Sequence, residues 1–202
     1  MWDTSTCTVT GSLKGHDEIV STFVFGNSLA TEDLVITGSL DRTIRIWQGT
    51  TCKSVLKDHS DWIRCLALTN DNERFLSGCV SASIVLWDLA TNKPLIKYTQ
   101  EQQANVLNTV NSVQFMNYNS NIFASGSRDG VIRLYDARDA TVKPTCSFLA
   151  HVKNNIPAKL NDAYFTSNDV YMISSGRDSA IRMWDLRKLT SNNSETTSII
   201  NT

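Results

Sequence analysis

The sequence predicts an all-β protein made of about four four-stranded sheets, because one pattern recurs along it. A small residue and Gly precede an alternating run that ends in an aromatic residue, and this pattern occupies residues 36–47, 76–87, 124–135 and 174–184. With a truncated copy at the start, the aromatic residues are Trp2, Trp47, Trp87, Tyr135 and Trp184, a period of 40 to 49 residues. Because blades of four strands repeat about every 40–45 residues, the sequence predicts a β-propeller.

Each period carries the signals of four strands in a fixed order. Residues 21–25 and 110–115 alternate in polarity and predict the innermost strand of a blade. A second run leads into the Gly, and a third ends at the aromatic residue, as in 43–47. An outer strand follows, as in 52–56. No long segment has a helical period, which favours an all-β class.

These signals divide the chain into one repeat domain and a tail. The domain covers residues 1–189, and its expected blades are residues 14–57, 58–99, 106–149 and 151–189, with 1–13 as the end of a preceding blade. Residues 190–202 are rich in Ser, Asn and Thr, which predicts a disordered tail. Within that tail, residues 196–200 have the composition of a weak outer strand.

Composition narrows the classes of partner. The formal net charge of −1 gives no electrostatic reason to expect nucleic acid or an anionic membrane as the ligand. No segment approaches the roughly 18 apolar residues of a membrane span, and the start lacks the features of a secretory signal. The five cysteines include no CxxC pair, so we expect free, mostly buried thiols in the cytoplasm or nucleus.

The repeats resemble those of the WD40-repeat family over residues 1 to about 189. The signature of that family is a Gly-His before the inner strand and a Trp-Asp that ends the third strand. Full matches are Gly15-His16, Trp87-Asp88 and Trp184-Asp185, and near matches are Asp58-His59, Ala150-His151 and Tyr135-Asp136. The resemblance implies a β-propeller that binds proteins or peptides, with no cofactor and no small-molecule substrate.

The resemblance also implies a buried hydrogen-bond chain within each blade, from Trp through Ser or Thr and His to Asp. The matching residues are Trp47, Thr37, His16 and Asp41 in the first blade, Trp87, Ser77 and His59 in the second, Tyr135, Ser125 and Asp129 in the third, and Trp184, Ser174 and Asp178 in the fourth. These types suit a chain because an indole N–H only donates, whereas a hydroxyl can accept and donate onward.

The fit to this pattern is uneven. The second blade has Ser81 in place of Asp, and the third has Tyr135 in place of Trp with its His position near Val106. In the fourth blade, a loop about five residues longer displaces His151. Only the first chain is therefore expected to be complete, and the loops 100–108 and 151–159 are expected to be free for binding.

The three histidines and the turn carboxylates also admit a catalytic interpretation, as metal ligands, acid–base groups or paired acids. Each His lies at or near its repeat position, which places the three on separate blades, and Asp41, Asp129 and Asp178 lie in equivalent turns. No GxSxG, Walker A or GxGxxG motif is present. The sequence therefore favours structural roles and a non-enzymatic protein.

Two sets of charged residues are candidates for partner binding. The third strands of the last two blades are followed by Asp136-Ala-Arg138 and Asp185-Leu-Arg187, which resemble the Asp-x-Arg boxes of cullin-4 ubiquitin ligase substrate receptors. In those receptors the arginines contact the ligase adaptor, and an Arg fork suits bidentate bonds to carboxylate or carbonyl groups. The alternative is that each Asp and Arg pair locally and cap a turn.

The second set is Arg42, Arg128 and Arg177, each next to a turn Asp position on the opposite rim. Three arginines on successive turns would favour an acidic or phosphorylated ligand. The alternative is a set of local salt bridges, each contributing under about 1 kcal/mol.

The number of repeats predicts a fragment of a seven-bladed ring, since propellers close and so remove their sheet edges. We expect such a piece to be marginally stable and to self-associate through its open ends; a closed four-bladed ring is the alternative. The predicted function is a scaffold or adaptor, with recruitment to a cullin-4 ligase as its sharpest form. The alternative is a structural subunit of a trafficking coat or RNA-processing complex.

Overall fold

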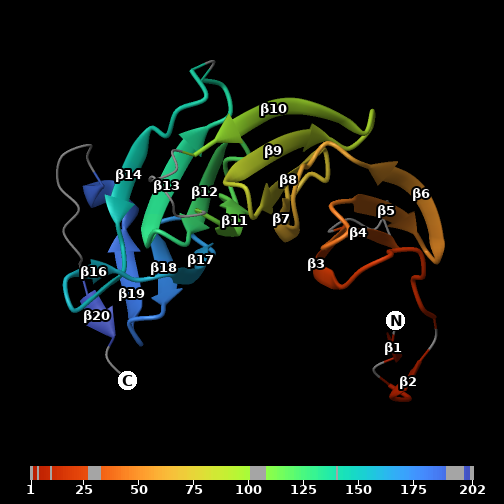
Figure 1. The fold of residues 1–202 in the computed structure, drawn as a ribbon, viewed down its shortest axis with the longest axis horizontal. Coiled ribbons are helices and arrows are strands. Elements are labelled where there is room, and N and C mark those ends of the chain that lie inside the picture. The colour runs from red at the N-terminus through yellow and green to blue at the C-terminus, as the bar shows by residue number, and fades with distance from the viewer. Residues whose placement is uncertain are drawn as a thin grey trace.

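The computed structural model describes residues 2–3, 5–9, 11–26, 33–100, 108–139, 141–189 and 198–200. These residues form strands, turns and a single turn of 3-10 helix, η2 (Leu186–Lys188). Four antiparallel sheets of four strands follow one another along the chain (Figure 1). The predicted all-β class and the four-stranded blades are confirmed.

The blades are numbered one to four in chain order, and each runs from its inner to its outer strand. Blade one contains β3 (Val20–Phe25), β4 (Leu34–Ser39), β5 (Ile44–Gln48) and β6 (Thr51–Leu56). Blade two contains β7 (Ile63–Leu68), β8 (Arg74–Cys79), β9 (Ser83–Asp88) and β10 (Lys93–Thr99). Blade three contains β11 (Val110–Phe115), β12 (Ile122–Ser127), β13 (Val131–Asp136) and β14 (Cys146–Leu149). Blade four contains β17 (Leu160–Phe165), β18 (Tyr171–Gly176), β19 (Ile181–Asp185) and β20 (Ser198–Ile200).

Two small hairpins accompany the blades. β1 (Trp2–Asp3) pairs with β2 (Thr8–Val9), which matches the third and outer strands of a further blade. β15 (Val152–Lys153) pairs with β16 (Ile156–Pro157) just before blade four. Its turn residues Asn154 and Asn155 both have positive φ, 53° and 61°. Asn tolerates this backbone region, which a tight two-residue hairpin turn requires.

The outer strand of blade four, β20, lies within residues 196–200, the part of the tail whose composition predicts a weak outer strand. Ile200 lies opposite Ile181, and Ser198 lies opposite Met183. The edge of β19 offers backbone groups for pairing, and the backbone of residues 198–200 pairs with it. The residues at 190–197, 201 and 202 lie outside the described part of the chain.

The four described blades form an arc (Figure 1). The inner strands lie side by side along it, since β7 contacts both β3 and β11, and β11 contacts β17. The outer strands β6, β10 and β14 lie on the convex side. Within the described residues no sheet of blade four pairs with blade one, so these blades do not close a ring.

The core lies between neighbouring blades rather than within a blade. Phe75 and Trp87 of blade two stack with ring centroids 5.7 Å apart and pack against the buried face of blade one. The repeat Gly allows this close approach, because a Cβ on Gly126 would lie only 2.2 Å from Cδ2 of Leu160. The faces without a neighbour expose apolar side chains, among them Phe23 of blade one, 59% exposed.

All five cysteines are free thiols, and their burial varies. Cys65 and Cys79 are buried, Cys52 and Cys146 are half-buried, and Cys7 is exposed. The expectation of mostly buried thiols is therefore correct for Cys65 and Cys79, in the two inner strands of blade two, and wrong for Cys7. Among the described residues, no helix has the length and apolar character of a membrane span.

Candidate functional site

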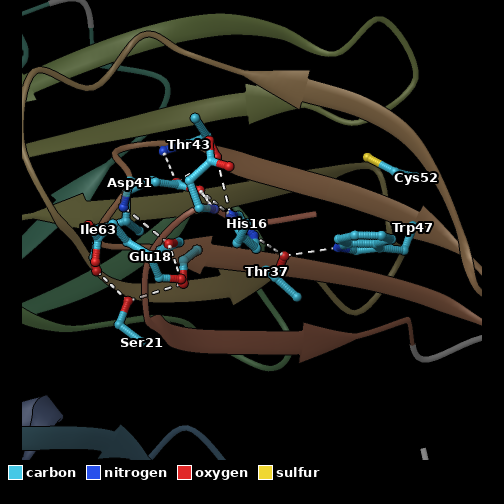
Figure 2. A network of polar contacts seen from close by, with 12 residues as sticks. His16, Glu18, Ser21, Thr37, Asp41, Thr43, Trp47, Cys52 and Ile63 are labelled. Carbon is cyan, nitrogen blue, oxygen red and sulfur yellow. Dashed lines mark hydrogen bonds and ion pairs between the residues drawn. The ribbon is translucent and has the colours of Figure 1, made fainter. Parts of the chain in front are cut away.

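Blade one contains a continuous chain of polar side chains (Figure 2). The Trp47 indole N–H donates to Oγ1 of Thr37 at 2.9 Å, and that oxygen lies 2.7 Å from Nε2 of His16. Nδ1 of His16 lies 2.7 Å from Oδ2 of Asp41. Because an indole can only donate, the Thr37 hydroxyl donates to Nε2, and the ring proton on Nδ1 is donated to the carboxylate.

The Asp41 carboxylate also shapes the turn between β4 and β5. It accepts the backbone N–H of Thr43 at 2.8 Å and the backbone N–H of Asp17 at 3.1 Å. Burial alone raises the pKa of Asp41, but hydrogen bonds from Thr43, His16 and Asp17 outweigh it and hold the pKa well below its usual range. This carboxylate is therefore a charged turn-former and is already fully used inside the blade.

Blade four repeats the chain in full, which corrects the expectation that its His is displaced. The Trp184 indole donates to Ser174 at 2.9 Å, Ser174 lies 2.8 Å from Nε2 of His151, and Nδ1 lies 2.8 Å from Asp178. The additional residues leave the blade after His151 as the β15–β16 hairpin, whose end is closed by a bond from the Ala158 N–H to the His151 carbonyl. The extra length therefore does not move the imidazole.

Blade two keeps the first half of the chain and changes its end. The Trp87 indole donates to Ser77 at 2.8 Å, and Ser77 lies 2.6 Å from Nε2 of His59. Beyond the imidazole, the hydroxyl of Ser83 and the thiol of Cys79, 3.0 Å apart, occupy the region of the missing carboxylate. Burial raises the pKa of Cys79, but hydrogen bonds from His59, Ser81 and Ser83 lower it to about 6.

Blade three uses an amide where the other blades use an imidazole. Gln100 donates from Nε2 to Ser125 at 2.8 Å and accepts at Oε1 from Ser127 at 2.6 Å. The repeat spacing predicts the missing His position near Val106, which lies outside the described residues, and does not single out Gln100. Asp129 remains in its turn, where it bonds Asn108 at 2.8 Å and Arg133 at 2.6 Å.

The two loops expected to be free for binding are anchored at their ends. Gln100 and Asn108 are buried and bonded to blade three, and His151 is fully buried in blade four. Residues 101–107, the interior of the first loop, lie outside the described part of the chain. The interior of the second loop is the exposed β15–β16 hairpin.

The candidate catalytic interpretation of the histidines finds no support in their positions. Each imidazole bonds only members of its own blade. Among the described residues, no three His, Cys, Asp or Glu side chains are arranged to hold a metal ion. The histidines and turn carboxylates thus belong to polar chains within the blades.

The two rims differ in charge and in how their arginines are used. The c–d rim is formed by the turns after the third strands, near residues 49–50, 89–92, 137–145 and 186–189. The b–c rim is formed by the turns before the third strands, near 40–42, 80–82, 128–130 and 177–180, together with the residues that precede the inner strands. Antiparallel strand order places these two sets at opposite ends of every blade.

On the c–d rim, the two Asp-x-Arg pairs have the same geometry. Arg138 Nη2 lies 2.6 Å from Asp136 and Arg187 Nη2 lies 2.7 Å from Asp185, and each Nε donates to the second carboxylate oxygen at 2.9 Å. These bonds lower the pKa of each carboxyl to about 2. The guanidinium side chains remain 65% and 66% exposed. Each pair thus caps its own turn and still presents an Arg to solvent.

On the b–c rim, the three arginines do not occupy equivalent positions. The Arg128 and Arg177 N–H groups bond the carbonyls of Thr109 and Lys159, the residues just before the inner strands. Arg42 lies further along its turn, at φ 67°. None of the three takes part in an ion pair with another described residue, so the expectation of local salt bridges is not met there.

The repeats are similar in sequence to those of known proteins. The family described as WD domain, G-beta repeat matches residues 7–48, 50–88, 97–136 and 142–185, which together cover most of the chain. The chain belongs to the WD40 family. Each match extends through the aromatic anchor of one blade, and the first begins at Cys7, next to the β2 strand.

Several relatives with WD40 repeats align over nearly the whole chain. They include pre-mRNA-processing factor 19 homolog 2 of Arabidopsis thaliana (23% identical, covering 94% of this chain and 34% of the relative) and nuclear distribution protein nudF of Aspergillus niger (26%, 87% and 41%). Autophagy-related protein 16 of Arabidopsis thaliana is 27% identical over 93% of this chain and 35% of its own length. The chain thus spans between a third and two fifths of these relatives.

The WD40 pattern explains why some residues of the polar chains can be recognised in the sequence and others cannot. The Trp, Ser or Thr, His and Asp positions are visible because they repeat. Gln100 breaks the repeat, and only its contacts show that it completes blade three. It directly follows the outer strand Lys93–Thr99 and is buried, but no repeated position marks it. Arg133 recurs as Arg45 and Arg182, and its pairing with the turn Asp is seen only in the structure.

Proposed function

We propose that this chain acts as a non-enzymatic protein-interaction scaffold within a multiprotein assembly. The observation that carries the proposal is how the WD40 repeats use their polar side chains. The imidazoles and turn carboxylates of blades one and four are consumed in buried chains, whereas arginines on both rims reach solvent. A rigid arc with charged rims suits binding to other proteins rather than chemistry on a substrate.

The relatives support an assembly role of this kind. Their names describe factors in pre-mRNA processing, nuclear distribution and autophagy, and no single process is common to the three. We therefore favour the structural or scaffolding subunit that the WD40 repeats suggest, acting in the cytoplasm or nucleus. An RNA-processing complex is the assembly to test first, since factors of that name appear among the relatives from plants and mammals.

The scaffold proposal can be tested by size-exclusion chromatography of cell extracts that contain the tagged chain. We expect it to elute with partners well above its own mass of 22.5 kDa. The pair Trp62→Ala and Arg177→Glu on the b–c rim, or Arg138→Ala and Arg187→Ala on the c–d rim, should return it to smaller species. If both rim variants co-elute with the same partners as the unaltered chain, the proposal is wrong.

A second candidate is docking on the adaptor of a cullin-4 ubiquitin ligase through Arg138 and Arg187. The observation that favours it is the identical geometry of two exposed Asp-x-Arg pairs on one rim of adjacent blades. Changing both arginines to Ala should abolish association of the purified chain with the adaptor. Lys93→Ala, which removes another exposed charge at the same rim, is the matched control, and adaptor binding that survives the double change would eliminate this candidate.

A further inference from the structure

The b–c rim carries a cluster of four cationic side chains that the blades do not use. They are Arg64 at the start of β7, Arg128 in the turn of blade three, and Lys159 and Arg177 of blade four. All four are exposed or half-buried. Lys159 and Arg177 line the same pocket, and burial, followed by the charges of Arg177, Arg64 and Arg128, lowers the pKa of Lys159. Cations that disfavour one another's charge in this way form a local field that an anion relieves.

The other arginines of blades three and four are neutralised within the fold. Arg133 pairs with Asp129 and Arg182 with Asp178 inside the blades, whereas Arg138 pairs on the opposite rim. The ion pairs of the described residues include none of the four b–c rim cations. Asp162, a carboxylate of the neighbouring inner strand, lines one pocket with Arg64 and accepts hydrogen bonds from the Ser112 hydroxyl and the Ala163 N–H. The side chains of Arg128, Lys159 and Arg177 are thus the cations most available to a ligand.

A shaped depression accompanies part of this cluster. Lys153, Lys159 and Arg177 line a pocket of about 340 Å³, together with Ile156, Pro157 and Ala158 of the hairpin region. Ile156 is 67% exposed. The hairpin is the additional segment of blade four. At this part of the rim it places cationic side chains beside apolar ones.

The opposite half of the same rim lacks cations at the equivalent turn positions. Leu40 and Val80 occupy the positions that Arg128 and Arg177 hold in the later blades, and their N–H groups bond the carbonyls of Ile19 and Trp62. Trp62 is 49% exposed and borders a second depression of about 490 Å³ with Leu40 and Arg42. Glu18 and Asp41 lie in that depression too, so Arg42 does not extend the basic cluster.

We propose that the b–c rim binds an acidic segment of a partner protein, whose carboxylate or phosphate groups contact Arg64, Arg128, Lys159 and Arg177 while its apolar side chains contact Ile156 and Trp62. This rests on the proposed scaffold function and names the chemistry of one partner. A protein segment fits better than RNA, because the net charge is −1 and the cations occupy one half of one rim rather than a long track. The apolar base and the exposed Trp also match the composition of protein interfaces.

The test measures fluorescence anisotropy of a labelled peptide that alternates Glu and Leu, titrated with the full 202-residue chain. Parallel titrations use the same peptide with phosphoserine in place of Glu and with Gln in place of Glu. We expect binding of the two anionic peptides, with the stronger one identifying the preferred source of negative charge. The affinity for the Gln peptide should be at least about tenfold lower than the affinity for the anionic peptides. Added salt should weaken the binding of the anionic peptides.

Charge reversal locates the site. Arg177→Glu and Lys159→Glu should each weaken the anionic peptides by about tenfold or more. Lys97→Glu is the matched control, because it makes the same charge change at an exposed position of the outer strand β10, and it should leave the affinity within about twofold. Should Arg177→Glu fail to fold, Arg177→Gln gives the same direction with a smaller change.

Three results would overturn the inference. The first is equal binding of the Gln peptide, and the second is equal weakening by Lys97→Glu. The third is tighter binding of single-stranded RNA or phosphatidylserine vesicles than of the anionic peptides, when the same variants abolish that binding. Any of these, obtained while the chain still assembles with partners in extracts, would refute the acidic-segment inference and leave the scaffold proposal standing.

Discussion

Blades three and four are neighbours with the same strand order, but their buried polar chains are built from different chemistry. Blade four joins Trp184, Ser174, His151 and Asp178, so its chain ends in an imidazole and a carboxylate. In blade three, a neutral amide bonds two hydroxyls at the equivalent place, and the turn carboxylate bonds Asn108 where that of blade four bonds a His. Both arrangements of polar side chains are compatible with the same backbone architecture.

The difference shows that the fold requires satisfied polar groups rather than a particular residue set. Tyr135 replaces the Trp anchor and stacks on Phe123 of its own blade with centroids 4.9 Å apart. Its ring also lies 5.1 Å from that of Tyr98 in blade two, so it keeps the apolar contact between blades. Gln100 offers a donor and an acceptor in one neutral side chain, which suffices for two hydroxyls. What blade three gives up is the titratable imidazole, and that difference can be measured.

The largest expected effect follows from removing the hydroxyl in the middle of the chain of blade four. Ser174→Ala leaves both the Trp184 indole N–H and Nε2 of His151 buried without a partner. At about 1–3 kcal/mol for each unpaired group, we expect the free energy of unfolding to fall by about 3 kcal/mol. Urea denaturation followed by tryptophan fluorescence measures the change.

Ser175→Ala is the matched control, because Ser175 is the next residue of β18 and its side chain points to the other face of the sheet. Its cost should stay within about 0.5 kcal/mol. Equal costs for the two variants would mean that the chain contributes no more than the loss of any strand hydroxyl.

The next effect is a dependence on pH that blade four has and blade three lacks. Burial lowers the pKa of His151 below the ordinary value of 6.5, against the opposing effect of Asp178. As the pH falls through 6.5, an unfolded His therefore binds a proton that the folded His151 does not, and blade four loses stability. Gln100 does not titrate, so its blade makes no such contribution.

Hydrogen exchange measured by mass spectrometry resolves the two blades in one experiment. After correction for the intrinsic exchange rate, peptides from β18 and β19 should lose protection between pH 7.5 and 5.5, by about tenfold at most, while those from β12 and β13 should not. His151→Gln, which copies the blade three chemistry, should flatten the response of blade four. A parallel decline in both blades would show that the imidazole is not its source.

The sequence was sufficient for the repeat but not for its exceptions. The strand order and the Trp, Ser and His anchors could be predicted because each recurs at a fixed spacing. Gln100 could not, since a single Gln carries no periodic signal and its role depends on where β10 ends. The position of His151 was missed for a related reason, because spacing alone cannot tell whether extra residues leave a blade before or after an anchor. The rim cluster of Arg64 and Lys159 could not be predicted, because its residues come together only in the three-dimensional structure.

Blade two offers the smallest test, because its chain matches that of blade four from Trp to His and lacks the carboxylate at its end. Ser81→Asp supplies the missing acceptor for Nδ1 of His59 and for the N–H two residues later, as Asp41 does for Thr43 in blade one at 2.8 Å. We expect a gain of about 1 kcal/mol in the free energy of unfolding, measured by urea denaturation, with a smaller gain for Ser81→Asn.

A second readout shows whether the carboxylate reaches its intended place. Cys79 lies 3.1 Å from the Ser81 hydroxyl, and its pKa of about 6 depends on hydrogen bonds from that hydroxyl and from His59. A carboxylate beside the thiol repels the thiolate and competes for His59, so Ser81→Asp should raise the pKa seen by ultraviolet thiolate absorbance. A raised pKa without added stability would mean that blade two, with its Cys79 and Ser83 pair, already satisfies the imidazole as well as a carboxylate does. In that case the residue at the end of the chain, unlike the hydroxyl at its centre, is interchangeable among the blades.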